Sequence, residues 1–208
     1  MPKRMTCHNS HANDMKRNFY GFNLLGMFCR TKMENGDRRI FGHFPEDRFV
    51  MSDGWKWGQV PVMELHPFDS LSGESIHCYE PHRVTHYKVH NPDEPGPCPP
   101  WPPEDCVDGV EWLERNFIEK WRPAINDGTF LHLGEFGCHQ GNVPHTTYLA
   151  WLEDMLKMCQ RHGWGWALWN LDGTFGILDT PRTDCEFEDF RGHRLDRKAL
   201  DLLRKYKI

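Results

Sequence analysis

The stretch Thr129-Phe130-Leu131-His132-Leu133-Gly134-Glu135 decides the fold. It is a short apolar run that follows turn residues and ends on a carboxylate, so it is predicted to be a buried strand. Amphipathic helices are predicted on both sides of it, because apolar residues recur at intervals of three and four over 107–121 and over 148–159. Residues 164–170 form the next predicted strand. Strands that alternate with helices of this length indicate right-handed β-α-β units and a parallel sheet, as in a doubly wound sheet or a (β/α) barrel.

Local signals set the limits of these helices. The apolar positions of the first predicted helix are Val107, Val110, Leu113, Phe117 and Trp121. Thr146 or Thr147 is expected to cap the second helix, and Gly163 is expected to end it. Asp196 is expected to cap a last helix near the C-terminus.

The N-terminal half has weaker signals. Further strands are predicted over 19–25, 48–54 and 75–79. The polar segment 29–47 and the proline-rich segment 91–103 are predicted to be loops.

Length and composition exclude several classes of protein. The 208 residues are 38% hydrophobic and 26% charged, which suffices for a buried core, and no apolar run is long enough to cross a membrane. The net charge of −5 argues against a general nucleic-acid binder. We interpret 1–16 as a basic flexible tail, with a nucleic-acid-binding arm as the alternative, and 17–208 as one domain. No secretory signal follows Met1, so the localisation stays open between the cytoplasm and secretion by a route that this chain does not encode.

Eight cysteines and thirteen histidines raise the question of a metal site. No two cysteines stand three apart and no H-E-x-x-H motif occurs, so neither a zinc knuckle nor a zincin helix is indicated. Two groups have ligand-like spacing, the trio Cys7-His8-His11 and the stripe His82-His86-His90. The prolines around the stripe favour a loop there. We therefore expect mostly free cysteines and neither a metal ion nor another cofactor, with a metal-dependent hydrolase as the weaker alternative.

Polar side chains follow the predicted strands where each strand ends. They are Asp53, then His77, Tyr79 and Glu80, then Glu135, and finally Trp169, Asn170 and Asp172. In barrels and open parallel sheets alike, ligands bind at this edge. On the pattern alone, a catalytic carboxylate and an ordinary Glu-Phe-Gly turn explain Glu135 equally well.

The nine tryptophans suggest a class of ligand. Four of them fall in predicted loops or strand ends, namely Trp55, Trp57, Trp101 and Trp169, and three others, Trp112, Trp151 and Trp166, belong to patterned elements. Indole rings outside the core stack well on the C–H faces of sugars. A carbohydrate is therefore the expected ligand of the first group, and the second group is expected to fill the core.

Several motifs together resemble glycoside hydrolase family 5, the cellulase family. The matching stretches are GFNLLGMF (21–28), SIHCYEP (75–81), LGEFG (133–137), WALWN (166–170) with GTFGILD (173–179), and EDFRGHRLDR (188–197). They are similar to the first, sixth, seventh and eighth barrel strands of that family and to a C-terminal segment of some members. The likeness covers 17–47 and 48–208.

The resemblance implies a retaining β-glycosidase on a (β/α)8 barrel that hydrolyses internal β-1,4 links of a plant-type polysaccharide. Glu135 matches the nucleophile. His77 and Tyr79 match the pair that binds near it, and Trp169 matches the aromatic floor under the reacting sugar. The expected partner is a β-linked oligo- or polysaccharide, with no nucleic acid and no membrane.

The chain departs from the family pattern at one place. Family members carry Asn-Glu-Pro at the end of the fourth strand, and the glutamate of that motif is the acid/base, but no Asn-Glu-Pro occurs in this chain. The match passes from Asp47 directly to Arg48, where strands two to four would lie. Glu80 is a poor substitute because it follows the sixth strand.

This departure predicts an incomplete barrel of about five strands with open edges, through which copies can associate. Loss of the acid/base typically removes about 10²–10⁴-fold of the rate, so weak or absent activity is expected. The alternative is a non-catalytic carbohydrate-binding or interaction remnant that keeps Trp169, Trp101 and part of the cleft.

Overall fold

The computed structural model describes residues 30–34, 37–41, 49–66 and 72–207. Its centre is a four-stranded parallel sheet with the strand order β3-β4-β5-β6. These strands are β3 (Val50–Asp53), β4 (Ser72–Cys78), β5 (Phe130–Phe136) and β6 (Trp166–Leu168). The predicted parallel sheet is confirmed, and the ends of all four strands lie within three residues of their predicted limits.

The two central strands differ in how they are buried. Every residue of β4 except Ser75 is buried, as expected of a strand that is covered on both faces. In β5 the apolar residues Leu131, Leu133 and Phe136 are buried. The register between the strands slips by one residue, so that Ile76 pairs with Leu133 but His77 pairs with Glu135.

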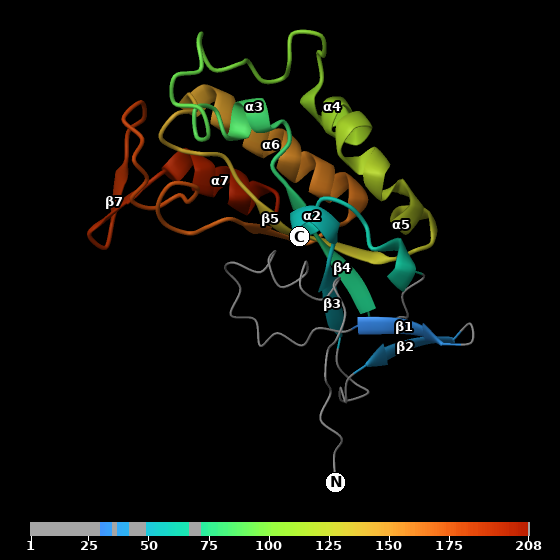
Figure 1. Cartoon of the computed structure of the whole chain (residues 1–208). Helices are drawn as coiled ribbons and strands as arrows, with labels where there is room; N and C mark the ends of the chain where they lie inside the picture. Colours follow the sequence, from blue (N-terminus) through green and yellow to red (C-terminus); the bar gives the residue numbers. More distant parts are fainter. Residues whose placement is uncertain (1–29, 35–36, 42–48, 67–71, 208) are drawn as a thin grey trace.

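Helices lie beside the sheet and pack against one another (Figure 1). The helical segments between the strands are α2 (Trp55–Gly58), η1 (Met63–Leu65), α3 (His82–Thr85), α4 (Gly109–Asn116), η2 (Ile118–Trp121), α5 (Arg122–Asn126) and α6 (His145–His162), and α7 (Arg197–Lys205) is the last. The long helix α6 packs against both α4 and α7. Its buried face includes Tyr148, Trp151 and Leu152, as the helical spacing predicts.

The predicted helix ends are confirmed in part. Gly163 ends α6 in the left-handed conformation, with φ 67°, and the Asp196 carboxylate accepts a hydrogen bond from the Ala199 N–H at the start of α7. The predicted cap of α6 by a threonine is wrong. Pro144 stands at that position, and the Asp184 carboxylate accepts a hydrogen bond from the His145 N–H at 2.7 Å instead.

Three sequence-based expectations need correction, and one pair of strands was not predicted. The segment predicted as a polar loop contains an antiparallel hairpin of β1 (Arg30–Glu34) and β2 (Asp37–Phe41), consistent with the Asn-Gly pair between them in the sequence. A second hairpin, β7 (Glu188–Phe190) with β8 (His193–Leu195), was not predicted. The long helix predicted from Val107 divides into α4, η2 and α5, and Val107 is fully exposed. The histidine stripe lies on and after the short helix α3 instead of in a loop.

The described residues thus contain four of the five expected barrel strands. The remaining one, over 19–25, lies outside the described residues, as do the predicted tail over 1–16 and the trio Cys7-His8-His11. In the part of the chain that the structure describes, no helix has the length and hydropathy needed to span a membrane. All six cysteines in this part are free, as expected.

Candidate active site

Four side chains meet at the carboxyl ends of three neighbouring strands. Asp53 ends β3, His77 and Tyr79 stand at the end of β4, and Glu135 stands near the end of β5. Because the strands are parallel and adjacent, the sheet brings residues far apart in the sequence to one edge. Three of the four predicted site residues therefore come together here, since His77 and Tyr79 both contact Glu135, and Asp53 lies beside His77.

Tyr79 holds one oxygen of the Glu135 carboxylate. Its hydroxyl donates a short hydrogen bond to Oε1 of Glu135. Burial raises the pKa of the Tyr79 phenol well above its usual value, and the hydrogen bond to Glu135 raises it further. The phenol therefore stays protonated at any physiological pH, and it remains a donor to the carboxylate.

His77 lies between two carboxylates. Its Nδ1 is 3.4 Å from Oε2 of Glu135, and its Nε2 is 3.5 Å from Oδ1 of Asp53. A Cβ built on Gly58 would lie 2.7 Å from the His77 ring, so only glycine at 58 leaves room for this ring position. Asp53 and Gly58 were not predicted as partners of His77, although Asp53 was placed at the correct sheet edge.

Trp169 follows β6 beside this cluster. The Trp169 N–H donates a hydrogen bond to the Phe136 carbonyl at 2.8 Å, directly after Glu135, and the side chain of Trp169 is half-buried. A Cβ on Gly137 would lie 2.6 Å from the Trp169 carbonyl oxygen, so these two backbone segments approach closely. The backbone of Trp169 thus lies beside the residue that follows Glu135, at the end of the neighbouring strand.

The other tryptophans expected to face a sugar behave differently from one another. Trp57 is 62% exposed and Trp55 is half-buried. Trp101 is only 7% exposed, packs edge-on against Trp112 and donates its indole N–H to Asp154 at 3.1 Å. The expectation that Trp101 is part of a sugar-binding cleft is therefore wrong, because this ring belongs to the core.

Glu80 takes part in different contacts from those of Glu135. Its carboxylate lies 3.6 Å from the Lys120 ammonium, and its backbone carbonyl accepts a hydrogen bond from the Trp151 indole. These contacts direct the residue toward α6 and η2. They agree with the expectation that Glu80 does not replace the missing acid.

A ladder of aromatic side chains beside Tyr79 was not predicted. The rings of His82 and His86 are stacked 4.7 Å apart, those of His86 and His90 are stacked 5.8 Å apart, and Tyr79 and Phe175 contact His86. Burial, reinforced by the neighbouring histidines, lowers the pKa of His86 to about 4. The four-residue spacing of these histidines is typical of one face of a helix, but the flanking prolines led to the prediction of a loop.

Comparisons with known proteins place this arrangement. No family model and no curated protein sequence matches the chain. Solved structures do match it. A crystal structure of a glycoside hydrolase is 30% identical with a TM-score of 0.67, over 78% of this chain and 49% of that one. The chain has the fold of a glycoside hydrolase.

Structures of two further proteins have a similar fold. The cellulose synthase subunit Z of Clostridioides difficile is 24% identical with a TM-score of 0.58, over 74% of this chain and 48% of that one. Cel5A of Thermotoga maritima, solved with cellobiose, is 19% identical with a TM-score of 0.54, over 76% and 48% of the two chains, and a structure with mannotriose gives similar values. This chain spans about half the length of the glycoside hydrolases it matches, so its sheet is part of a (β/α)8 barrel. The predicted resemblance to family 5 cellulases is confirmed at the level of the fold.

Proposed function

We propose that this chain is a cellulase-like glycoside hydrolase barrel in which Glu135 is a nucleophile toward β-linked sugars. The observation that carries the proposal is the fixed carboxylate of Glu135. One of its oxygens accepts a hydrogen bond from Tyr79, and the other lies 3.4 Å from His77. A carboxylate oriented by two neighbours at a sheet edge suits attack on an anomeric carbon better than it suits a solvated surface position.

The second carboxyl that such a reaction needs has no counterpart in the sequence. In retaining glycosidases one carboxyl attacks and a second, about 5–5.5 Å away, protonates the leaving oxygen. The Asn-Glu-Pro motif that supplies this acid in the family is missing from the chain. We therefore propose that the chain alone hydrolyses natural glycosidic bonds weakly or not at all.

The proposed ligand is a β-linked gluco- or manno-oligosaccharide. Two complexes of the related Cel5A contain cellobiose and mannotriose, which supports this class of sugar. Trp169, half-buried beside Glu135, is the proposed stacking surface. Its apolar ring face suits the C–H face of a pyranose.

A substrate with a leaving group that needs no acid tests the nucleophile directly. In 2,4-dinitrophenyl 2-deoxy-2-fluoro-β-cellobioside, a Glu135 oxygen would bond to C1 while dinitrophenolate departs unprotonated. The fluorine slows hydrolysis of the resulting ester, so the adduct accumulates. We expect one glycosyl group per chain, located on Glu135 by peptide mass spectrometry.

Matched variants make this test specific. Glu135→Gln should form no adduct, whereas Glu80→Gln should react like the unmodified chain, because Glu80 pairs with Lys120. Labelling that persists in Glu135→Gln would refute the proposed nucleophile. On carboxymethylcellulose and mannan, robust turnover by the unmodified chain would refute the proposed impairment.

A non-catalytic carbohydrate-binding remnant is the second candidate, favoured by the missing acid. It predicts saturable binding of cellohexaose or mannohexaose in calorimetry, with no adduct from the fluorinated reagent. Trp169→Ala should abolish that binding. Phe190→Ala, which removes an exposed aromatic ring from β7, outside the group of tryptophans expected to bind a sugar, is the control.

A further inference from the structure

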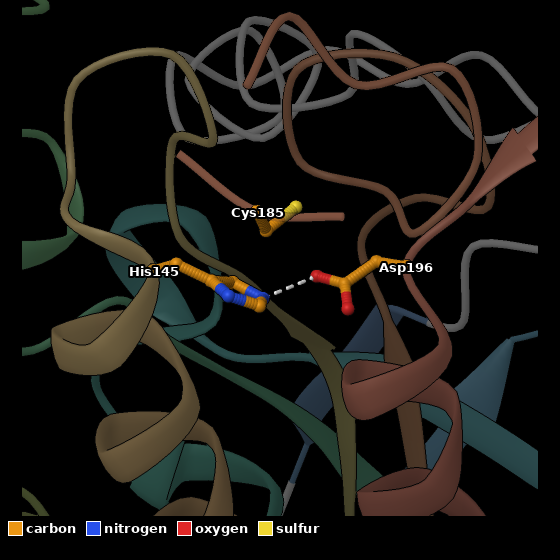
Figure 2. Close-up of side chains that lie close together, drawn as sticks. All are labelled: His145, Cys185 and Asp196. Carbon is orange, nitrogen blue, oxygen red and sulfur yellow. Dashed lines mark hydrogen bonds and ion pairs between the residues drawn. The ribbon is translucent and has the colours of Figure 1, made fainter. Parts of the chain in front are cut away.

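Three potential metal ligands converge in the C-terminal part of the chain, on segments that carry none of the four side chains Asp53, His77, Tyr79 and Glu135. His145 is the first residue of α6, Cys185 lies before β7, and Asp196 directly precedes α7. Figure 2 shows His145 and Asp196 pointing toward each other, with Cys185 above the gap between them. Their donor atoms all lie within 4.8 Å of one another, and His145 Nε2 is 2.8 Å from Oδ2 of Asp196.

The donor set has the chemistry of a zinc site. Zinc binds imidazole nitrogen, thiolate sulfur and carboxylate oxygen at about 2.0–2.3 Å in a tetrahedral arrangement, often with water as the fourth ligand. Such bonds place neighbouring ligand atoms about 3.4–3.8 Å apart. From the observed spacing, the thiol and the carboxylate would have to move by roughly 1 Å.

We propose that His145, Cys185 and Asp196 bind one divalent cation of the zinc type, with solvent in the fourth position. The site lies where a bound ion would be shielded, because the side chains of His145 and Asp196 are only 7% and 2% exposed. A carboxylate, a thiolate and a dication sum to zero net charge, which suits a buried position.

The surroundings hold the carboxylate in place. Oδ1 of Asp196 accepts a hydrogen bond from the Ala199 N–H at 3.1 Å, which leaves Oδ2 directed at His145. The backbone of His145 is held in turn by Asp184. Outer contacts of this kind orient metal ligands and raise affinity.

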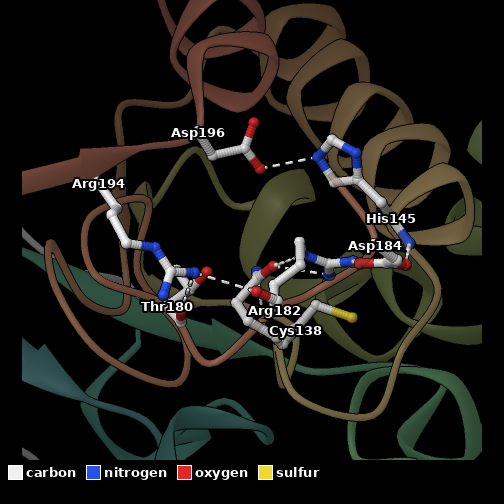
Figure 3. A network of polar contacts seen from close by, with 8 residues as sticks. Cys138, His145, Thr180, Arg182, Asp184, Arg194 and Asp196 are labelled. Carbon is white, nitrogen blue, oxygen red and sulfur yellow. Dashed lines mark hydrogen bonds and ion pairs between the residues drawn. The ribbon is translucent and has the colours of Figure 1, made fainter. Parts of the chain in front are cut away.

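Arg182 and Arg194 lie near Asp196, but both donate hydrogen bonds to other groups (Figure 3). Arg182 donates to Asp184 at 2.7 Å and to the Gln140 amide oxygen at 2.8 and 3.1 Å. Arg194 donates to the backbone carbonyls of Thr180 and Arg182. Their guanidinium groups therefore leave the Asp196 carboxylate to His145 and the cation.

A cation here would join three separate parts of the chain. It would tie the start of α6 and the start of α7 to the segment that holds Cys185. Metal that binds only the folded chain stabilises it. The proposed role is thus a structural clip on the C-terminal part of the barrel, independent of the chemistry at Glu135.

Cobalt(II) is a suitable probe, because a thiolate ligand gives a near-ultraviolet charge-transfer band and tetrahedral geometry gives strong visible bands. The full chain, stripped with chelator, is titrated with Co²⁺ and then with Zn²⁺ in competition. We expect one equivalent with both spectral features, displacement by Zn²⁺, and a higher Tm with Zn²⁺ than with chelator.

Variants separate this site from the other cysteines. Cys185→Ser and Asp196→Asn should weaken Co²⁺ binding by about 100-fold or more, since even outer-contact changes cost 10–100-fold. Asn at 196 keeps an oxygen that can cap α7, so circular dichroism should confirm a folded chain. Cys7→Ser, which changes the trio Cys7-His8-His11, is the control and should bind Co²⁺ normally.

Three outcomes would overturn the proposal. They are the absence of stoichiometric binding, the same binding in Cys185→Ser as in the unmodified chain, and loss of binding in Cys7→Ser alone. In the first case His145 and Asp196 form only a structural hydrogen bond between α6 and α7.

Discussion

Tyr79 and Glu135 lie on neighbouring strands, and the hydroxyl of the first holds Oε1 of the second. A slip in the β4–β5 register makes this contact possible, because His77 pairs with Glu135 and Gly134 is the extra residue. A Cβ on Gly134 would lie 2.1 Å from the Ser75 hydroxyl oxygen, so any larger residue there would force the Ser75 side chain to move. Bulges that redirect a side chain are common next to active sites.

Replacing Tyr79 with phenylalanine should slow attack by Glu135. The substitution removes the donor to Oε1 and leaves the aromatic ring in place. A hydrogen bond to a charged group contributes about 1.5–3 kcal/mol, so the carboxylate loses its fixed orientation and adduct formation should slow by about 10–100-fold. The rate is measured by mass spectrometry with the fluorinated cellobioside.

Tyr87→Phe is the matched control for this prediction. The Tyr87 hydroxyl donates to the Gly96 carbonyl, a contact that does not involve Glu135. Its loss should leave the labelling rate unchanged. Equal slowing in both variants would show a general effect on the fold and contradict the assigned role of Tyr79.

Alanine at Gly58 should destabilise the chain and displace His77. Gly58 has φ 68°, and its Cβ would lie 2.7 Å from the His77 ring. The left-handed conformation alone costs alanine about 1–2 kcal/mol. The steric conflict should add about 1–3 kcal/mol.

Gly163→Ala separates the two contributions to this loss. Gly163 has nearly the same φ, 67°, with no atom within 4 Å of a built Cβ. Urea unfolding should therefore show a smaller loss for Gly163→Ala than for Gly58→Ala. Equal losses would mean that His77 moves aside at no cost, and its position would then not depend on Gly58.

The sequence was sufficient for those parts of the fold that depend on a repeating apolar pattern. The strands ending at Asp53, Cys78 and Phe136 and the long helix capped by Gly163 are all present. The strands were predicted from short apolar runs bounded by turn residues, and the helix from apolar residues that recur at intervals of three and four. The contacts of His77 and Tyr79 with Glu135 also agree with the family resemblance.

Features that depend on contacts between distant segments could not be predicted from the sequence. Trp101 was expected to be exposed because it lies in a proline-rich segment, but its ring packs on Trp112 and its indole N–H donates a hydrogen bond to Asp154. The convergence of Cys185 with His145 and Asp196 has no spacing signal, since Cys185 and Asp196 follow His145 by 40 and 51 positions. Only the folded chain brings them together.

A buried histidine away from the candidate site should make stability depend on pH. The ring of His66 lies 2.9 Å from Glu74 and 3.0 Å from Asp127, and Glu74 is fully buried. Burial alone would lower the pKa of His66, but the hydrogen bonds to these two carboxylates raise it above its ordinary 6.5. The charged imidazolium is thus favoured in the folded chain.

The sign of this effect follows from proton linkage. With a raised folded pKa, the contribution of His66 is fully present below pH 6.5 and is lost as the pH rises through the folded value. The free energy of unfolding of the unmodified chain, minus that of His66→Gln, should therefore be smaller at pH 8 than at pH 6. Urea titrations of both proteins at the two pH values measure this difference.

His132→Gln supplies a control of opposite sign, because burial lowers the pKa of His132 and the same difference should rise with pH. A difference for His66→Gln that stays constant or rises between pH 6 and pH 8 would contradict the prediction.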